Sequence, residues 1–309
     1  MLAVSALVGL MGVLPAFGGD APDRKRDTAA FEAAAGSLAA AELPEGVRAP
    51  MLTTLRQHPT ETQWSGRAGK AIFAVAVRPL PSGPIRDRAV PAFLQVVHSL
   101  AVSEMLTAKS LLDHYAAAGL TDATVLRQAV LQVSGQLGIA GKSEGFTHQA
   151  KVQGEFAVAY VIADEGTLAT QLLQPAELAT VKTAYREAMH KQARELMERK
   201  KWQDAVLLWH HLHTRKLVSQ ALYLDAATCF VELKKPGDAL KVLEEAYAAF
   251  SATASADWLE QCGDLACKLG KPGESLALQA YQRASATLMN TTSDRARGKL
   301  GIEPQPAKR

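Results

Sequence analysis

Apolar residues recur at helical spacing through residues 186–289, the stretch around which the chain is organised. Ala205 is followed by Trp209 and Leu212, and offsets of four and seven place these three residues on one face of a helix. The same face returns 34 residues later, at Ala239, Leu243 and Ala246. A fixed period of this length predicts helical hairpins in tandem, each of which buries its apolar face against the next.

Recurring turn signals divide this stretch into three hairpins. An acidic residue followed by a small one recurs at Asp204-Ala205, Asp238-Ala239 and Glu274-Ser275, and the small residues are 34 and 36 positions apart. The second and third of these pairs follow directly on Pro-Gly, at Lys235-Pro236-Gly237 and Lys271-Pro272-Gly273. A Pro-Gly pair cannot continue the helix before it, and the acidic residue favours the start of the next helix.

Small residues also stand twelve positions before Ala205 and Ala239, at Ala193 and Ala227, and bulky Leu196 and Phe230 follow three positions later. In this pattern, residues 186–289 resemble the tetratricopeptide repeat family. The third unit departs from the family at Gln279 and Gln282, and a two-residue shift restores its second helix through Ala277, Tyr281 and Ala284. A generic antiparallel helical bundle is the alternative, because it has the same periodicity.

The resemblance implies a concave groove lined by the first helix of each hairpin. The groove positions carried over are Glu187, His190, Arg194 and Met197 in the first unit, Leu224, Thr228 and Val231 in the second, and Asp257, Glu260 and Asp264 in the third. Chaperone-binding members of the family hold the carboxylate of a peptide C-terminus with Lys and Asn. These groove positions carry neither residue, so the C-terminal tail of a chaperone is not the expected ligand. The acidic third unit favours a basic partner, and Leu224 and Val231 would form an apolar floor. A solvated helix face is the alternative for any of these residues.

The middle of the chain, residues 68–170, predicts a small α+β domain. A strand, a long helix, a short helix and two further strands are expected at residues 72–77, 90–118, 123–132, 146–152 and 156–163. Gln153-Gly154 favours a tight hairpin turn between the last two strands. The final strand is apolar on both faces and should be central in the sheet. This order of elements weakly resembles the small βαββ domains of bacterial envelope and flagellar proteins.

The two ends of the chain are expected to lie outside these domains. Residues 2–19 carry no charge, and Pro15-Ala16-Phe17-Gly18 lies near their end, which is typical of a secretory signal peptide over residues 1–18. A membrane anchor is the alternative, because the apolar run reaches the lower length limit of a membrane span. Residues 19–67 are interpreted as a linker with one short helix, and residues 290–309 as a disordered tail.

Composition narrows the chemistry that the chain can perform. A net charge of +3 and 6% aromatic residues give no indication of nucleic-acid binding. The three cysteines match no zinc pattern, although a disulfide between Cys229 and Cys262 remains open. His210-His211-x-His213 is the strongest metal candidate, but only two of its imidazoles share a helix face, so no metal or other cofactor is expected. No catalytic motif of established spacing is present, and no catalytic residue is assigned.

The sequence therefore predicts a mostly α protein with a small α+β domain, in which a βαββ-like domain precedes a short array of helical hairpins over residues 175–289. We expect a non-catalytic adaptor or scaffold in a bacterial envelope assembly, periplasmic or secreted, which binds a basic or apolar protein segment in the groove. It would contact a membrane only through an uncleaved signal. An envelope enzyme or enzyme subunit with its site in the α+β domain, and with the repeats as a docking arm, is the alternative.

Overall fold

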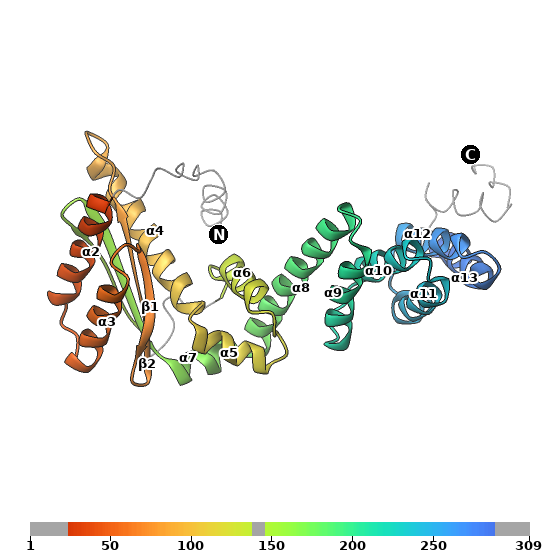
Figure 1. Ribbon diagram of the computed structural model, residues 1–309, viewed down its shortest axis with the longest axis horizontal. Coiled ribbons are helices and arrows are strands. Elements are labelled where there is room, and N and C mark those ends of the chain that lie inside the picture. Colours follow the sequence, from red (N-terminus) through yellow and green to blue (C-terminus); the bar gives the residue numbers. More distant parts are fainter. Residues whose placement is uncertain (1–23, 138–145, 288–309) are drawn as a thin grey trace, which may run out of the picture. The chain divides into compact units, whose positions relative to one another are not determined.

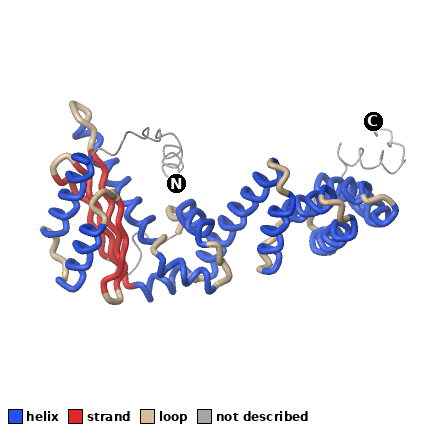
Figure 2. Tube along the Cα trace, in the orientation of Figure 1, coloured by secondary structure: helices blue, strands red, loops and turns tan. Residues whose placement is uncertain are grey.

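The computed structural model describes residues 24–137 and 146–287, so the signal peptide and tail expected at residues 1–18 and 290–309 lie outside the described residues. The chain divides into two compact units, Met1–Val181 and Lys182–Arg309. Unit 1 contains a four-stranded sheet with helices, and in the part of unit 2 that is described the secondary structure is helical (Figure 2). The expected fold class, mostly α with a small α+β domain, is confirmed.

The sheet of unit 1 is antiparallel and has the order β1-β2-β4-β3. Its strands are β1 (Gln63–Ala68), β2 (Ala71–Pro79), β3 (Thr147–Gln153) and β4 (Phe156–Asp164). The expectation that the last strand is central is confirmed, since β4 pairs with β2 on one side and β3 on the other. Gly154 has a φ of +60°, a value that glycine adopts readily, and it forms the turn between β3 and β4.

The segment expected to be a linker is instead part of the folded unit. Residues within 24–68 form α2 (Arg24–Ala39), α3 (Glu45–Gln57) and β1. Helices α2 and α3 cover one face of the sheet (Figure 1), and their Leu38 and Met51 belong to the same buried core as Trp64. The one short helix expected in the linker is present as α2, but α3 and β1 were not expected. The packing of α2 on the sheet was missed because α2 buries mainly alanines, such as Ala30 and Ala34, whose weak apolar periodicity does not stand out in the sequence.

The other face of the sheet is covered by α4 (Arg86–Leu106), which packs against β2 and β4. The single helix expected at residues 90–118 is wrong: the chain takes an extended backbone at Ala108, with ψ of 138°, and α5 (Lys109–Ala117) begins after it. The short helix is confirmed as α6 (Ala123–Val133), where the Asp122 side chain caps the amide of Val125. By length and composition alone, α4 is the one described helix that could cross a membrane.

Two helices complete unit 1 and lead into unit 2. The first is α7 (Glu165–Leu172), which follows β4 without a loop, and the second is α8 (Pro175–Glu198). Unit 2 then continues through α9 (Trp202–Thr214), α10 (Gln220–Glu232), α11 (Pro236–Phe250), α12 (Ala256–Lys268) and α13 (Lys271–Thr287). Lys200, Lys234 and Gly270 take positive φ at the turns into α9, α11 and α13, and Lys216 does so between α9 and α10. The turns into α9, α11 and α13 join the helices pairwise into successive hairpins.

The third hairpin departs from the register expected for it. Gly273, and not Ser275, is the buried small residue at the start of α13, and it lies 34 positions after Ala239. A Cβ at Gly273 would overlap the main-chain carbonyl of Ala266, so the two helices pack with main chain against main chain. The turn is shorter by two residues, because Gly273 follows positive-φ Gly270 by three positions whereas Ala239 follows Lys234 by five.

Candidate functional site

The first-unit groove residues lie together on one face of α8. Glu187 and Arg194 are exposed and His190 is half-buried. A hollow with a volume of about 500 Å³ lies over this face, and Glu187, His190, Lys191, Arg194, Glu195 and Glu198 line it. The lining residues stand 3, 4, 7, 8 and 11 positions after Glu187, which is the spacing of a single helix face.

Asp225 on α10, which sequence reasoning missed, joins this face to the next hairpin. Its Oδ2 accepts a hydrogen bond of 2.9 Å from Arg194 Nε and lies 2.6 Å from His190 Nε2. Burial raises the pKa of the Asp225 carboxyl, but the hydrogen bonds from His190 and Arg194 outweigh this effect, and the pKa is lowered overall. His190 and Arg194 are therefore engaged by a carboxylate of the same chain.

The second-unit residues lie on α10 and do not line this hollow, and they are less accessible than expected. Leu224 is buried, with 7% of its surface exposed, because it packs within the stacked helices of unit 2. Thr228 is half-buried, and its hydroxyl donates to the carbonyl of Leu224. Val231 is also half-buried. Of the two apolar residues, Val231 and not Leu224 therefore offers surface to a ligand.

The acidic residues expected in the third unit do not act together as a charged surface. Asp257 is exposed, but Glu260 is only 3% exposed and belongs to the interior of α12. Asp264 accepts a hydrogen bond of 2.6 Å from the Tyr281 hydroxyl of α13. Burial and this hydrogen bond both raise the pKa of Tyr281. The prediction of an acidic trio facing the groove is therefore corrected to a single exposed carboxylate, Asp257.

The three histidines of α9 point to different partners. His211 Nε2 lies 2.9 Å from the Tyr185 hydroxyl, and His213 Nε2 lies 2.6 Å from Glu245 Oε1. His210 is exposed and its ring lies 4.7 Å from that of Trp209. No group of three His, Cys, Asp or Glu side chains in the described part of the chain is arranged to hold a metal ion.

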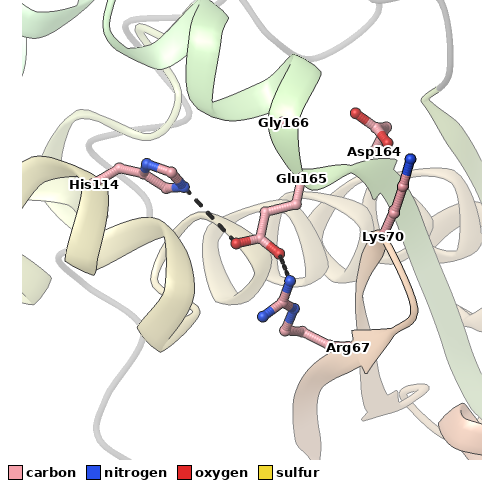
Figure 3. A pocket seen from close by; sticks show the side chains of 6 residues that line it. All are labelled: Arg67, Lys70, His114, Asp164, Glu165 and Gly166. Atoms are coloured by element: carbon pink, nitrogen blue, oxygen red, sulfur yellow. Dashed lines mark ion pairs between the residues drawn. The ribbon is translucent and has the colours of Figure 1, made fainter.

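A polar pocket in unit 1 was not expected from the sequence. It lies where the β1–β2 turn meets α5 and the start of α7, has a volume of about 400 Å³, and is lined by Arg67, Lys70, His114, Asp164, Glu165 and Gly166. Figure 3 shows Glu165 between Arg67 and His114, with Lys70 and Asp164 beside them. Arg67 Nη2 lies 2.7 Å from Glu165 Oε2, and His114 Nε2 lies 3.8 Å from Glu165 Oε1.

The local chain explains why these side chains converge. β4 runs directly into α7, and the Asp164 carboxylate caps that helix by accepting from the amide and the hydroxyl of Thr167. The main-chain amide of Glu165 donates to the carbonyl of Lys70, which ties α7 to the β1–β2 turn. The pair Asp164-Glu165 at the end of an apolar strand was the one available signal, but the partners of Glu165 come from distant segments.

The cysteines of unit 2 are free thiols, and the disulfide that the sequence left open between Cys229 and Cys262 is not formed. Both of these residues are buried, and burial raises the pKa of each thiol to about 12. Cys267 is exposed.

No family model, curated relative or solved structure matches this chain.

Proposed function

We propose that this chain is a non-catalytic adaptor of a bacterial envelope assembly, and that it binds a protein partner along the first helices of its hairpins. The observation that carries the proposal is the hollow of about 500 Å³ on α8. Four of its charged side chains, Glu187, Lys191, Glu195 and Glu198, form no ion pair with any described residue. Charges presented in a concave surface without internal partners are available to a ligand.

The charges of the hollow favour a basic segment. Asp225 already engages His190 and Arg194, which leaves three glutamates against one lysine on the same face. A peptide that carries Lys or Arg would complement this excess of negative charge, and Val231 would contact an apolar side chain of the same peptide. No nucleic acid is part of this proposal, since the hollow repels a polyanion.

A tetratricopeptide-like array would present this surface in the proposed way. The small residues Ala205, Ala239 and Gly273 are buried at a constant interval of 34 positions, and this supports the resemblance to that family. Export to the periplasm or beyond is proposed from the uncharged residues 2–19 and the small residues that end them. The alternative, an envelope enzyme or enzyme subunit, is favoured by the pocket around Glu165 in unit 1.

Site-specific photo-crosslinking in a Gram-negative host tests the proposal. The full chain is produced with a photoreactive amino acid in place of Glu195, which lines the hollow, or in place of Lys241, which is exposed on α11. We expect a defined protein adduct from position 195 and none from position 241. The adduct should disappear in the Glu187→Lys/Glu198→Lys double variant, because charge reversal repels a basic segment.

Two outcomes would contradict the adaptor proposal. One is the same set of adducts from positions 195 and 241, which would indicate non-specific contact. The other is an adduct that survives charge reversal, which would place recognition outside the hollow. A Glu244→Lys variant on α11 serves as the matched control, since this exposed glutamate lies outside the hollow.

A further inference from the structure

The pocket of unit 1 combines charged side chains that no adaptor role requires. Arg67 and Lys70 come from β1 and its turn, His114 from α5, and Asp164 and Glu165 from the junction of β4 and α7. These segments are far apart in the sequence and meet around a hollow of about 400 Å³, which is large enough for a small metabolite.

Both acidic residues of the pocket are engaged by the protein itself. The Glu165 side chain is 12% exposed and pairs with Arg67. The Asp164 carboxylate is held by Thr167 at the start of α7, and these hydrogen bonds lower the pKa of Asp164. A cationic ligand would therefore have to compete with Arg67 for Glu165 and with the helix amides for Asp164.

The basic side chains of the pocket have N–H donors that the ion pairs within the protein do not use. A guanidinium has five N–H donors, and Glu165 is the one ion-pair partner of Arg67 among the described residues; the Arg67 side chain is 59% exposed. Lys70 forms no ion pair with any described residue. The His114 side chain is 45% exposed and approaches Glu165 no closer than 3.8 Å. Arg67, Lys70 and His114 line the same hollow. Figure 3 shows the Lys70 ammonium beside Asp164, and Arg67 and His114 on two sides of Glu165.

We propose that this pocket binds a small molecule through an oxyanion, a carboxylate or a phosphate, which Arg67, Lys70 and His114 hold together. The ion pair with Glu165 holds the Arg67 guanidinium at the edge of the pocket. The N–H groups of the guanidinium that Glu165 does not use face the ligand. Planar bidentate recognition of an oxyanion is the chemistry for which an arginine fork is suited, and Lys70 adds a compact point charge. The site is independent of the partner groove, because the pocket lies wholly in unit 1 and the groove in unit 2.

Titration of the full chain with sodium phosphate and with sodium acetate at constant ionic strength tests this site, followed by calorimetry or by amide chemical shifts. We expect saturable binding of at least one of the two anions, and the stronger one identifies the oxyanion class. Lys70→Gln should weaken binding at least fivefold. Arg67→Lys keeps the charge and removes the fork, so it should weaken binding of the preferred anion as well.

The acetate titration also tests His114, which lines the hollow beside Glu165. His114→Gln should weaken acetate binding, because it replaces the imidazole that faces the hollow. Acetate binding that is unchanged in His114→Gln would contradict the assignment of His114.

Arg48→Gln is the matched control, because Arg48 pairs with Glu45 on α3 as Arg67 pairs with Glu165, but lines neither of the two hollows described above. It should leave anion binding unchanged. Equal losses in Arg48→Gln and Lys70→Gln, or no saturable binding of either anion at about 50 mM, would overturn the proposal. The thermal midpoint of each variant shows that it is folded. An absence of anion binding would leave the crosslinking result at position 195 unaffected, so the two proposals are tested independently.

Discussion

The main chain of Gly273 lies directly against the main chain of Ala266, where the two helices of the third hairpin pack together. The equivalent glycine of the second hairpin, Gly237, has no atom within 4 Å of the place where a Cβ would be. Both glycines follow Lys-Pro in the sequence, at Lys235-Pro236 and Lys271-Pro272. The same three residues therefore occupy an open position in one hairpin and a close contact in the next.

Gly273→Ala should destabilise unit 2. The added methyl group meets backbone atoms of Ala266, which cannot rotate away, so α13 has to shift from α12. Overpacking of this kind costs about 1–3 kcal/mol of unfolding free energy, and contact with rigid backbone places the expected loss at the upper end. Chemical denaturation followed by tryptophan fluorescence, to which Trp258 on α12 contributes from a buried position, would measure it.

Gly237→Ala is the matched control for that substitution. Its Cβ enters open space, so the free energy of unfolding should stay the same or rise by up to about 1 kcal/mol, because alanine is the better helix former. Equal losses in the two variants would show that the Lys-Pro-Gly turn, and not the contact with Ala266, requires glycine.

Asp225→Asn should weaken the connection between the first two hairpins. The variant removes the negative charge that lies within hydrogen-bonding distance of both His190 and Arg194. Hydrogen bonds to charged groups contribute about 1.5–3 kcal/mol, and the partial exposure of this site reduces the expected loss to about 1–2 kcal/mol. Denaturant unfolding at pH 7 measures this loss, and Glu244→Gln, an exposed change on α11, should have no effect.

The same carboxylate should contribute to acid sensitivity. Because the folded state lowers the pKa of Asp225, its stabilisation is present above the usual aspartate pKa of about 3.9 and is lost as the pH falls through the lower folded value. The stability difference between the parent protein and Asp225→Asn should therefore shrink below about pH 4. A difference that stays constant down to pH 2 would show that the charge of Asp225 is not responsible.

His98 should make unit 1 less stable in mild acid. Burial, and then the nearby His148 with its ring centre 4.8 Å away, lower the pKa of His98. The unfolded chain takes up the proton first, so the stability is complete above about pH 6.5 and falls as the pH drops through the folded pKa. His98→Gln should reduce the change in thermal midpoint between pH 7.5 and pH 5.5. His58→Gln, at an exposed position of unit 1, should leave it unchanged.

The three cysteines should differ in their reaction with Ellman's reagent. Cys267 is exposed and should react in the native protein, whereas Cys229 and Cys262 are buried with thiol pKa values of about 12 and should react only after denaturation. We expect one thiol before denaturation and three afterwards. If only one thiol reacts after denaturation, Cys229 and Cys262 form a disulfide in the isolated protein.

The candidate sites could be predicted from the sequence only in part. The resemblance to the tetratricopeptide repeat family implied the α8 face with Glu187, His190 and Arg194, and helical spacing places these positions on one face. Asp225 was missed because it meets His190 across 35 positions of chain, and the burial of Glu260 depends on how α12 packs. The Arg67–Glu165 pair spans 98 positions, and no local pattern connects its members.

By itself, the sequence determined the local structure of this protein: the helical hairpins, the turn at Gly154 and the central position of β4. These follow from periodicity, turn chemistry and strand composition, which act over a few residues. Only the tertiary structure decided that residues 24–68 cover and extend the sheet, that Gly273 takes the close contact in place of Ser275, and that five charged or titratable side chains meet at the unit 1 pocket. Each of these depends on contacts between distant segments, and weakly patterned residues such as the alanines of α2 acquire their roles only through those contacts.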